Sequence, residues 1–349
     1  MRILITADYH LTRKRLHYDY GLLDRIFAFL REEVDPDIHV IAGDLLDSPS
    51  EARSSLINDF VSLLTKYFSK TYILSGNHDI GAVENIVKTF SVLNSDKVVG
   101  VDFDHLFIKE CNSVKVALVP WLDCCNYDWI PMADIFITHN SFKGDFGDFI
   151  VDYGWDPELW GGIIFDGHIH RAIENNSVVY VGALLNHNFT YEKSIPGAVF
   201  VDIIDGNIEW NRVRLPDTMV KKFKTVNLEA ISFRDFKSKD QKVLSNLPSI
   251  IIGDDVFHEY HVKVRYNGNG STAKAIMSLS DPEKGIYFYP DNISIDYRPV
   301  IDAIVEDNFS IEEYFKEYIK SGKGKYSDEF LDALYKEGIK AIRRLSRED

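Results

Sequence analysis

The sequence predicts an α/β protein, and three observations point to that class. Short runs of aliphatic and β-branched residues at 3–7, 38–42 and 72–74 indicate buried strands. Stretches with apolar residues at helical spacing, 19–33 and 56–68, separate these runs. Each run also ends in a group of polar residues. Strands that alternate with helices of this length are typical of βαβ units, in which the strands are parallel.

Length, composition and charge exclude several classes of protein. The chain has 349 residues, enough for two or three domains, and 45% apolar residues, enough for a sizeable core. Its net charge of −15 is unlike that of a passive DNA coat, so any contact with nucleic acid must be local, metal-mediated or shared with a partner. The three cysteines lack zinc-site spacing, and no window is apolar enough to span a membrane. We therefore expect a soluble, cytoplasmic protein without membrane contact.

The first predicted strand leads directly into Asp8-Tyr9-His10. Side chains alternate along a strand, so residues two apart point the same way, and Asp8 and His10 can converge on one ion. The alternative is that they only begin a polar loop. The basic residues that follow form either a solvated loop or a patch that faces phosphate: Arg13, Lys14 and Arg15.

The next two strands end in the same way. One leads into Gly43-Asp44, where glycine allows a sharp turn and Asp44 emerges at the edge of the sheet. The other leads into Gly-Asn-His-Asp, in which Asp79 either orients the histidine or closes the turn. Taken alone, this tetrapeptide could be a tight turn. The spacing between successive polar groups is about one βα unit, which favours a common site.

Two more predicted strands, 135–138 and 162–165, are each followed by histidine. The first leads to His139, and the second leads to His168 and His170, which are two apart and so face one side. Five of the eleven histidines follow an apolar strand in this way, and the other six are interpreted as surface or core residues. Further strands are predicted at 114–119, 178–181 and 198–204, with a hairpin turn at 204–208.

The polar groups at the strand ends supply oxygen and imidazole ligands and no cysteine. This ligand set suits Mn²⁺, Fe²⁺ or Zn²⁺ in a catalytic site. There are too many ligands for one ion, so two ions about 3.5–4 Å apart that share a carboxylate are the economical arrangement. Such a pair lowers the pKa of bound water and clamps a phosphate ester, which predicts hydrolysis without a covalent enzyme intermediate.

The order of these motifs, Asp-x-His, Gly-Asp, Gly-Asn-His-Asp, His and Gly-His-x-His, resembles that of the calcineurin-like metallophosphoesterases over about residues 1–215. Within that superfamily the chain is similar to SbcD-type nuclease subunits, and most similar to the recombination endonuclease subunit of T-even-like phages. The resemblance implies a two-sheet sandwich with flanking helices. It also implies a DNA exonuclease and endonuclease of recombination, replication and double-strand-break repair, in the host cytoplasm if a phage encodes it.

The resemblance also assigns roles to individual residues. It implies two divalent metal ions, Mn²⁺ in the relatives, with Mg²⁺ or Fe²⁺ as alternatives. His78 corresponds to a histidine that is no ligand and that stabilises the transition state or protonates the leaving oxygen. Two departures are Asp47, where cellular relatives often have histidine, and 182–186, where they have Gly-Ser-x-x-Arg. The implied ligands of the first ion are Asp8, His10, Asp44 and His170, and those of the second are Asp44, Asn77, His139 and His168.

The remaining sequence divides into two further parts. Residues 216–305 are predicted to form a small α+β domain, with strands at 221–228 and 259–266 and a short helix near 271–279. The resemblance implies that this is a capping domain that takes part in DNA recognition. Residues 306–349 contain two amphipathic stretches that either pack on their own domain or dock a partner. The resemblance implies a coiled-coil ABC-type ATPase as that partner, DNA as the substrate, and a homodimer within the complex. The candidate partner-binding residues are Tyr314, Phe315, Ile319, Phe330, Leu331 and Leu334.

Other functions compete with a nuclease. A small-molecule phosphoesterase or a cyclic-nucleotide phosphodiesterase would use the same metals. Phosphoprotein phosphatases of the superfamily have Arg-Gly soon after the second motif, where this chain has Ser48-Pro49-Ser50. A non-catalytic scaffold should lack a ligand or His78, and none is missing. We therefore expect a nuclease.

Overall fold

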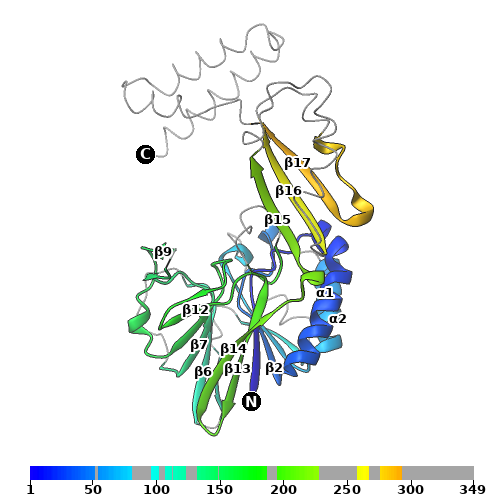
Figure 1. Cartoon of the computed structure of the whole chain (residues 1–349). Coiled ribbons are helices and arrows are strands. Elements are labelled where there is room, and N and C mark those ends of the chain that lie inside the picture. Colours follow the sequence, from blue (N-terminus) through cyan, green and yellow to red (C-terminus); the bar gives the residue numbers. More distant parts are fainter. Residues whose placement is uncertain are drawn as a thin grey trace, which may run out of the picture.

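The fold is a sandwich of two six-stranded sheets, with a separate three-stranded sheet beyond it (Figure 1). The predicted α/β class and the two-sheet sandwich with flanking helices are confirmed. The predicted C-terminal helices within 306–349 lie outside the described residues. The computed structural model describes residues 1–51, 54–80, 96–101, 107–111, 113–122, 132–147, 149–186, 195–227, 258–266 and 276–292.

The first sheet contains the N-terminal strand–helix units. Its order is β14-β13-β1-β2-β3-β4, with β1 to β4 parallel and β13 antiparallel to both of its neighbours. Side chains alternate across the sheet, so Leu4 packs toward the helices while Ile3 and Ile5 pack toward the second sheet. The strands are β1 (Arg2–Thr6), β2 (Ile38–Ile41), β3 (Thr71–Leu74), β4 (Val98–Val101), β13 (Gly197–Ile204) and β14 (Asn207–Arg214).

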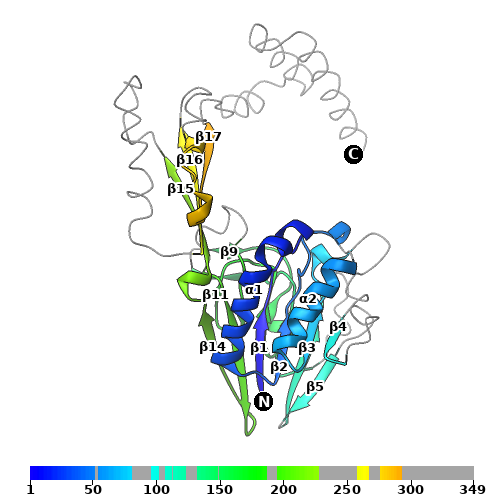
Figure 2. The ribbon, with the colours of Figure 1, turned by 90° about the vertical axis from the view of Figure 1, so that its right-hand side faces the viewer.

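Two helices, α1 (Arg13–Val34) and α2 (Ser54–Tyr67), lie side by side over the outer face of the first sheet (Figure 2). Their contact is partly aromatic, since Phe27 and Phe60 pack edge to face with ring centroids 6.1 Å apart. Both helices turn their apolar stripes to the sheet, as their sequence periodicity predicts. None of the helices among the described residues is long and apolar enough to cross a membrane.

The start of α1 corrects one sequence prediction. The helix begins at Arg13 rather than at Asp19, so Arg13, Lys14 and Arg15 form its first turn and not a loop. The carboxylate of Glu51 accepts a hydrogen bond of 2.9 Å from the backbone N–H of Arg13 and satisfies one of the unpaired donors at the helix start. This cap comes from a distant segment, so the local sequence carries no sign of it.

The second sheet has the order β11-β12-β10-β7-β6-β5, with a parallel centre and an antiparallel strand at each edge. Its inner face packs on the first sheet through side chains such as Ile137 and Phe165, which are fully buried. The strands are β5 (Phe107–Cys111), β6 (Val114–Val119), β7 (Ile135–Thr138), β10 (Ile163–Asp166), β11 (Ile173–Glu174) and β12 (Val178–Tyr180). A separate small hairpin is formed by β8 (Gly144–Asp145) and β9 (Ile150–Val151).

The third sheet is made of three parallel strands, β15 (Lys221–Asn227), β16 (Glu259–Tyr266) and β17 (Ile286–Asn292). The first two were predicted from the sequence. The third was not, because Pro290 is a poor strand residue that an edge position tolerates. The sheet is tied to α1 by the ammonium group of Lys221, which forms an ion pair with the carboxylate of Asp19.

Candidate metal centre

Parallel strands of both large sheets deliver polar residues to one edge of the sandwich. The carboxyl ends of parallel strands lie at the same edge, which is where ligands bind in α/β sheets. The segment after β2 is joined to the segment after β7, because His139 Nδ1 donates a hydrogen bond of 2.7 Å to the carbonyl of Ala42. The residues at this edge are Asp8 and His10 after β1, Asp44 after β2, Asn77 and His78 after β3, His139 after β7, and His168 and His170 after β10.

Several of these residues have a strained backbone. The left-handed region is uncommon for residues other than glycine, and it persists only where the surrounding structure imposes it. Such strain concentrates at functional sites, and most of the described non-glycine residues with positive φ lie at this edge. They are Asp8 (φ 54°), His10 (φ 45°), Asp44 (φ 49°) and His168 (φ 62°).

The glycines of the motifs allow the strand ends to approach one another. A Cβ atom on Gly43 would lie 2.2 Å from Nδ1 of His139, and one on Gly76 would lie 2.2 Å from Oδ1 of Asp44. A Cβ atom on Gly167 would lie 2.1 Å from the carbonyl oxygen of Ala42. A side chain at Gly43 or Gly167 would push the two sheets apart at the site, and one at Gly76 would displace Asp44 within the first sheet. The glycines are therefore required for the convergence of the polar groups.

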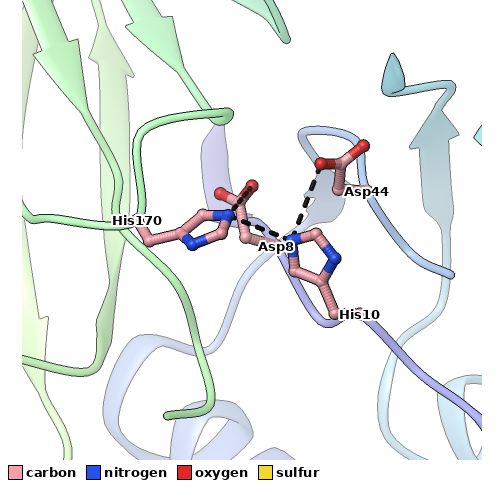
Figure 3. A group of neighbouring side chains, drawn as sticks. All are labelled: Asp8, His10, Asp44 and His170. Carbon is pink, nitrogen blue, oxygen red and sulfur yellow. Dashed lines mark hydrogen bonds and ion pairs between the residues drawn. The ribbon is translucent and has the colours of Figure 1, made fainter. Parts of the chain in front are cut away.

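The first cluster consists of Asp8, His10, Asp44 and His170, whose ligand atoms all lie within 4.8 Å of one another (Figure 3). The Nε2 atoms of His10 and His170 are 3.0 Å apart. His170 Nε2 lies 3.5 Å from Oδ1 of Asp8, and His10 Nε2 lies 3.6 Å from Oδ2 of Asp44. Two imidazole nitrogens and two carboxylates therefore converge, which is a set of donors that suits a divalent cation.

The carboxylate of Asp8 shows that the first cluster fits a cation. The side chain is fully buried, and neither oxygen accepts a hydrogen bond within the described part of the chain. Burial raises the pKa of Asp8 well above its ordinary value, and the carboxylate of Asp44 adds to this effect. A buried carboxylate without hydrogen bonds is costly, and a bound cation would remove that cost.

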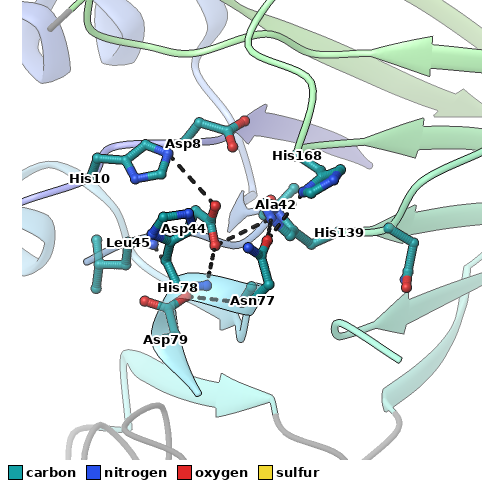
Figure 4. Close-up of polar contacts among 12 residues, drawn as sticks. Asp8, His10, Ala42, Asp44, Leu45, Asn77, His78, Asp79, His139 and His168 are labelled. Atoms are coloured by element: carbon teal, nitrogen blue, oxygen red, sulfur yellow. Dashed lines mark hydrogen bonds and ion pairs between the residues drawn. The ribbon is translucent and has the colours of Figure 1, made fainter. Parts of the chain in front are cut away.

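The second cluster consists of Asp44, His139 and His168, and Asn77 joins it through contacts with both histidines (Figure 4). The side-chain oxygen of Asn77 lies 3.2 Å from Nε2 of His139 and 3.1 Å from Nδ1 of His168. Nε2 of His139 also lies 3.3 Å from Oδ1 of Asp44. Because Nδ1 of His139 donates to the Ala42 carbonyl, Nε2 of a neutral ring presents a lone pair to these oxygens.

The electrostatics of His139 indicate that the second cluster favours a positive charge. Burial lowers the pKa of His139, but the carboxylates of Asp44, Asp8 and Asp166 together outweigh burial and raise the pKa to about 10. The surrounding oxygens therefore favour a positive charge at this position. A divalent cation coordinated by these atoms would supply that charge, so the residues present fit a metal ion.

Asp44 belongs to both clusters and uses a different oxygen for each. Oδ2 lies near His10 in the first cluster, and Oδ1 lies near His139 in the second. Burial raises the pKa of Asp44, but the two histidines and a backbone N–H outweigh burial and lower it below its ordinary value. An ionised carboxylate placed between two clusters has the geometry of a bridging ligand.

His78 lies beside the clusters and is a member of neither in the described residues. Its ring is exposed and lies 4.8 Å from the ring of His10, measured between centroids. Nδ1 of His78 donates a hydrogen bond of 2.8 Å to the backbone carbonyl of Asp47. This bond fixes the orientation of the ring and leaves Nε2 to interact with a bound substrate.

Asp79 closes the turn that carries Asn77 and His78, which decides between the two roles expected for it. Its carboxylate accepts hydrogen bonds from the backbone N–H groups of Gly76 at 2.9 Å, Leu45 at 3.2 Å and Leu46 at 2.9 Å. Burial and the neighbouring Asp44 raise the pKa of Asp79 to about 7. Asp79 therefore links the turn after β3 to the loop after β2, which carries Asp44.

Most of the other predicted contact residues lie outside the side chains that the structure describes. The side chain of Arg13 is exposed on the first turn of α1, and those of Lys14 and Arg15 are not among the described residues. The partner-binding candidates Tyr314, Phe315, Ile319, Phe330, Leu331 and Leu334 also lie outside the described ranges.

Sequence reasoning missed one residue at the site, Trp121. It follows β6, and its indole ring lies 5.1 Å from the ring of His168 and 6.3 Å from the ring of His139, measured between centroids. The signal that could have found it is positional, because Trp121 follows an apolar strand of the sheet that carries His139, His168 and His170. Its chemistry differs from theirs, so it did not stand out as a ligand.

Comparison with known proteins places most of the sandwich in one family. Residues 1–200 match the sequence profile of the family described as calcineurin-like phosphoesterase. Among solved structures, the chain is similar to an archaeal phosphodiesterase at 14% identity, over 61% of this chain and 100% of that chain, with a TM-score of 0.34. It is also similar to a protein of Thermus thermophilus (14% identity, 61% and 99% coverage, TM-score 0.40) and to a Pseudomonas putida nuclease (14% identity, 59% and 86% coverage, TM-score 0.30).

Proposed function

The chain belongs to the calcineurin-like phosphoesterase family, and we propose that within it the protein is a nuclease that hydrolyses phosphodiester bonds of DNA. The observation that carries this proposal is the sharing of Asp44 between two clusters of buried and half-buried ligands, with His78 beside them. A scaffold has no need to keep an exposed histidine oriented next to such clusters. A structural metal site would also have no need of two adjoining ligand sets.

We propose two divalent cations as cofactors and expect both to be Mn²⁺, with Mg²⁺ or Fe²⁺ as alternatives. When bound, such cations lower the pKa of water and neutralise charge on the phosphate. The donor set of nitrogen and oxygen atoms without sulfur fits this choice. Asp8, His10, Asp44 and His170 would hold one ion, and Asp44, Asn77, His139 and His168 would hold the other.

The protein's own residues would orient His78 and transfer a proton to the leaving oxygen. His78 is fixed by two hydrogen bonds, from its backbone N–H to Asp44 and from its Nδ1 to the carbonyl of Asp47. Its Nε2 can stabilise charge on the phosphate or protonate the leaving oxygen. The buried carboxylate of Asp79 joins the loop after β2, which carries Asp44, to the turn after β3, which carries His78.

The third sheet supports DNA rather than a small molecule as the substrate. The three strands of the sheet contain five lysine and arginine residues, Lys221, Lys222, Lys224, Lys263 and Arg265, and two carboxylates, Glu259 and Asp291. Five cations and two carboxylates leave a surplus of three cations, and Lys221 is paired with Asp19 and Arg265 with Asp291. This local excess of positive charge stands out in a chain whose net charge is −15. Lysine and arginine side chains supply the contacts to phosphate that dominate DNA affinity. We therefore propose 216–305 as a capping domain that contributes to DNA recognition.

We further propose that the nuclease works in a DNA break-processing complex of the SbcD type. Its partner would be a coiled-coil ABC-type ATPase, bound through residues 306–349, and the nuclease would form a homodimer within the complex. An acidic protein has weak non-specific affinity for DNA, because that affinity comes mainly from neutralised phosphates. A partner that grips DNA would compensate for this weakness.

A substrate panel tests the proposed activity. The purified full chain with Mn²⁺ is incubated with labelled single- and double-stranded DNA, with p-nitrophenyl phosphate and with a cyclic nucleotide, and Asp8→Asn serves as the control against contaminating nucleases. We expect cleavage of DNA by the wild type that stops on chelation and is absent in Asp8→Asn. Hydrolysis of only the small substrates would make the protein a small-molecule phosphoesterase or cyclic-nucleotide phosphodiesterase, and no hydrolysis with both ions bound would make it a scaffold.

A further inference from the structure

Trp121 is held in a fixed position at the edge of the second cluster. Its backbone N–H donates a hydrogen bond of 2.8 Å to the carbonyl of Ser75, which precedes the Gly76 turn. On the other side, the side chain of Asn140 accepts a bond of 3.0 Å from the N–H of Leu122 and donates one of 3.2 Å to the carbonyl of Pro120. Trp121 is therefore anchored to both sheets, next to the residues that carry ligands.

The indole ring of Trp121 is placed differently from the tryptophans of the core. Trp155 and Trp160 are 1% and 3% exposed and pack in the apolar cluster of the second sheet. Trp121 lies outside that cluster and is only half-buried, with its ring inclined at 45° to the ring of His168. Part of the indole thus faces the imidazoles of the second cluster, and part remains accessible to solvent.

We propose that Trp121 is a substrate-binding residue, whose indole forms a stacking surface for the base of the nucleotide joined to the scissile phosphate on the side of the second cluster. This inference rests on the proposed nuclease function. A phosphate held between the clusters places the adjoining nucleotide beside their rim, where Trp121 lies against His168 and His139. Stacking on an aromatic ring is worth about 1–3 kcal/mol per base and tolerates any base, because every base has a π face.

The alternative role for Trp121 is to position His168 by ring packing. The two roles differ in what they change. A stacking surface acts on substrates that carry a base, and its loss raises KM more than it lowers kcat. A positioning residue acts through the ligand, so its loss weakens metal binding and reduces hydrolysis of every diester. The second role is thus separable from the first by substrate choice and by Mn²⁺ affinity.

The test compares wild type, Trp121→Phe and Trp121→Leu, all as the full chain with Mn²⁺, on two diesters. One substrate is a labelled single-stranded oligonucleotide, and the other is methyl p-nitrophenyl phosphate, which has no nucleoside. For Trp121→Leu we expect the loss of kcat/KM on the oligonucleotide to exceed the loss on the small diester by about 5- to 150-fold, mainly through KM. Trp121→Phe keeps an aromatic face and should lose much less.

An abasic site next to the cleaved bond provides a second comparison. If the base stacks on Trp121, the penalties of the abasic substrate and of Trp121→Leu are not additive, because each removes the same contact. Equal losses on both diesters, additive penalties, or weaker Mn²⁺ binding by Trp121→Leu in calorimetry would overturn the proposal and make Trp121 a positioning residue. A wild type that cleaves the small diester and no oligonucleotide would instead contradict the nuclease function itself.

Discussion

The backbone N–H of His78 donates a hydrogen bond of 2.9 Å to Oδ1 of Asp44. The proposed proton donor and the proposed bridging carboxylate are thus joined directly, although they follow different strands. The bond ties the backbone of His78 to the side chain of Asp44. The contact explains how a histidine outside both clusters can keep a defined position relative to them.

His78→Ala should abolish cleavage while leaving both cation sites occupied. The imidazole lies outside the clusters, whereas the hydrogen bond to Asp44 comes from the backbone and survives the substitution. Loss of a general acid or of charge stabilisation typically costs about 10²- to 10⁴-fold in rate. Single-turnover cleavage and metal content by mass spectrometry check this. Loss of both metals in the variant would mean that His78 is structural.

Asp44→Ala should impair Mn²⁺ binding more than Asp8→Ala does. Asp44 has an oxygen in each cluster, whereas Asp8 contributes to the first cluster only. Removing Asp44 weakens both sites, and removing Asp8 leaves the second set of donors intact. Calorimetric titration of the two variants with Mn²⁺ measures the difference. Equal residual occupancy would argue against a bridging role for Asp44.

Asp79→Asn should destabilise the protein and slow cleavage without removing any group of the clusters. The carboxylate accepts three backbone N–H bonds, and an amide presents its own N–H₂ group to some of these donors. Leaving a buried donor unpaired costs about 1–3 kcal/mol. Chemical denaturation measures the effect, with Asp152→Asn, an exposed position, as the matched control. An unchanged free energy of unfolding would show that the three bonds are dispensable.

His39 should make the fold sensitive to acid. Burial lowers the pKa of this fully buried side chain from 6.5 to about 3. The ring packs against Phe68 at an interplanar angle of 39° and shares a hydrogen bond with Thr6. In the unfolded chain His39 is protonated as the pH falls below 6.5, whereas in the folded chain it stays neutral until about pH 3. The free energy of unfolding therefore decreases as the pH falls below 6.5. Between pH 7 and pH 5 this contribution amounts to about 2 kcal/mol.

The measurement for His39 is the free energy of unfolding at both pH values for the wild type and for His39→Leu. We expect the variant to be less stable at pH 7, because it loses the bond to Thr6, and to lose less stability on acidification. Identical pH dependence in the two proteins would mean that His39 accepts a proton in the folded state.

Phe330→Ala with Leu331→Ala, introduced in the full chain, should weaken binding of the proposed ATPase partner. Buried aromatic and aliphatic anchors dominate such interfaces. Co-purification with the ATPase measures binding, and Mn²⁺-dependent cleavage of a short oligonucleotide monitors the nuclease alone. Unchanged binding would place the docking surface elsewhere, and loss of solubility would indicate that 306–349 packs on its own domain.

The location of the site could be predicted because parallel strands end at a common edge. Asp8, Asp44 and His139 each follow an apolar run, so alternation and strand order suffice to bring them together. Their roles as metal ligands remain predictions. The left-handed backbone at Asp8 and Asp44 could not be predicted, since it accompanies hydrogen bonds between the loops after β1 and β2, from the N–H of Asp8 to the carbonyl of Gly43 and from the N–H of His10 to the carbonyl of Asp44.

Other features depend on contacts between distant residues. The start of α1 is set by the carboxylate of Glu51, and the turn at Asp79 is set by the loop after β2. The division of the two oxygens of Asp44 between the clusters is a matter of side-chain geometry that no spacing rule gives. Trp121 was missed because an aromatic residue at a strand end more often belongs to a core.

The most direct test of the two-cation centre is a crystal of the full chain grown with Mn²⁺, measured at the manganese absorption edge. We expect two peaks of anomalous density about 3.5–4 Å apart, with Asp44 between them. One peak should contact Asp8, His10 and His170, and the other should contact Asn77, His139 and His168. A single peak, or two peaks of which only one contacts Asp44, would contradict the shared centre.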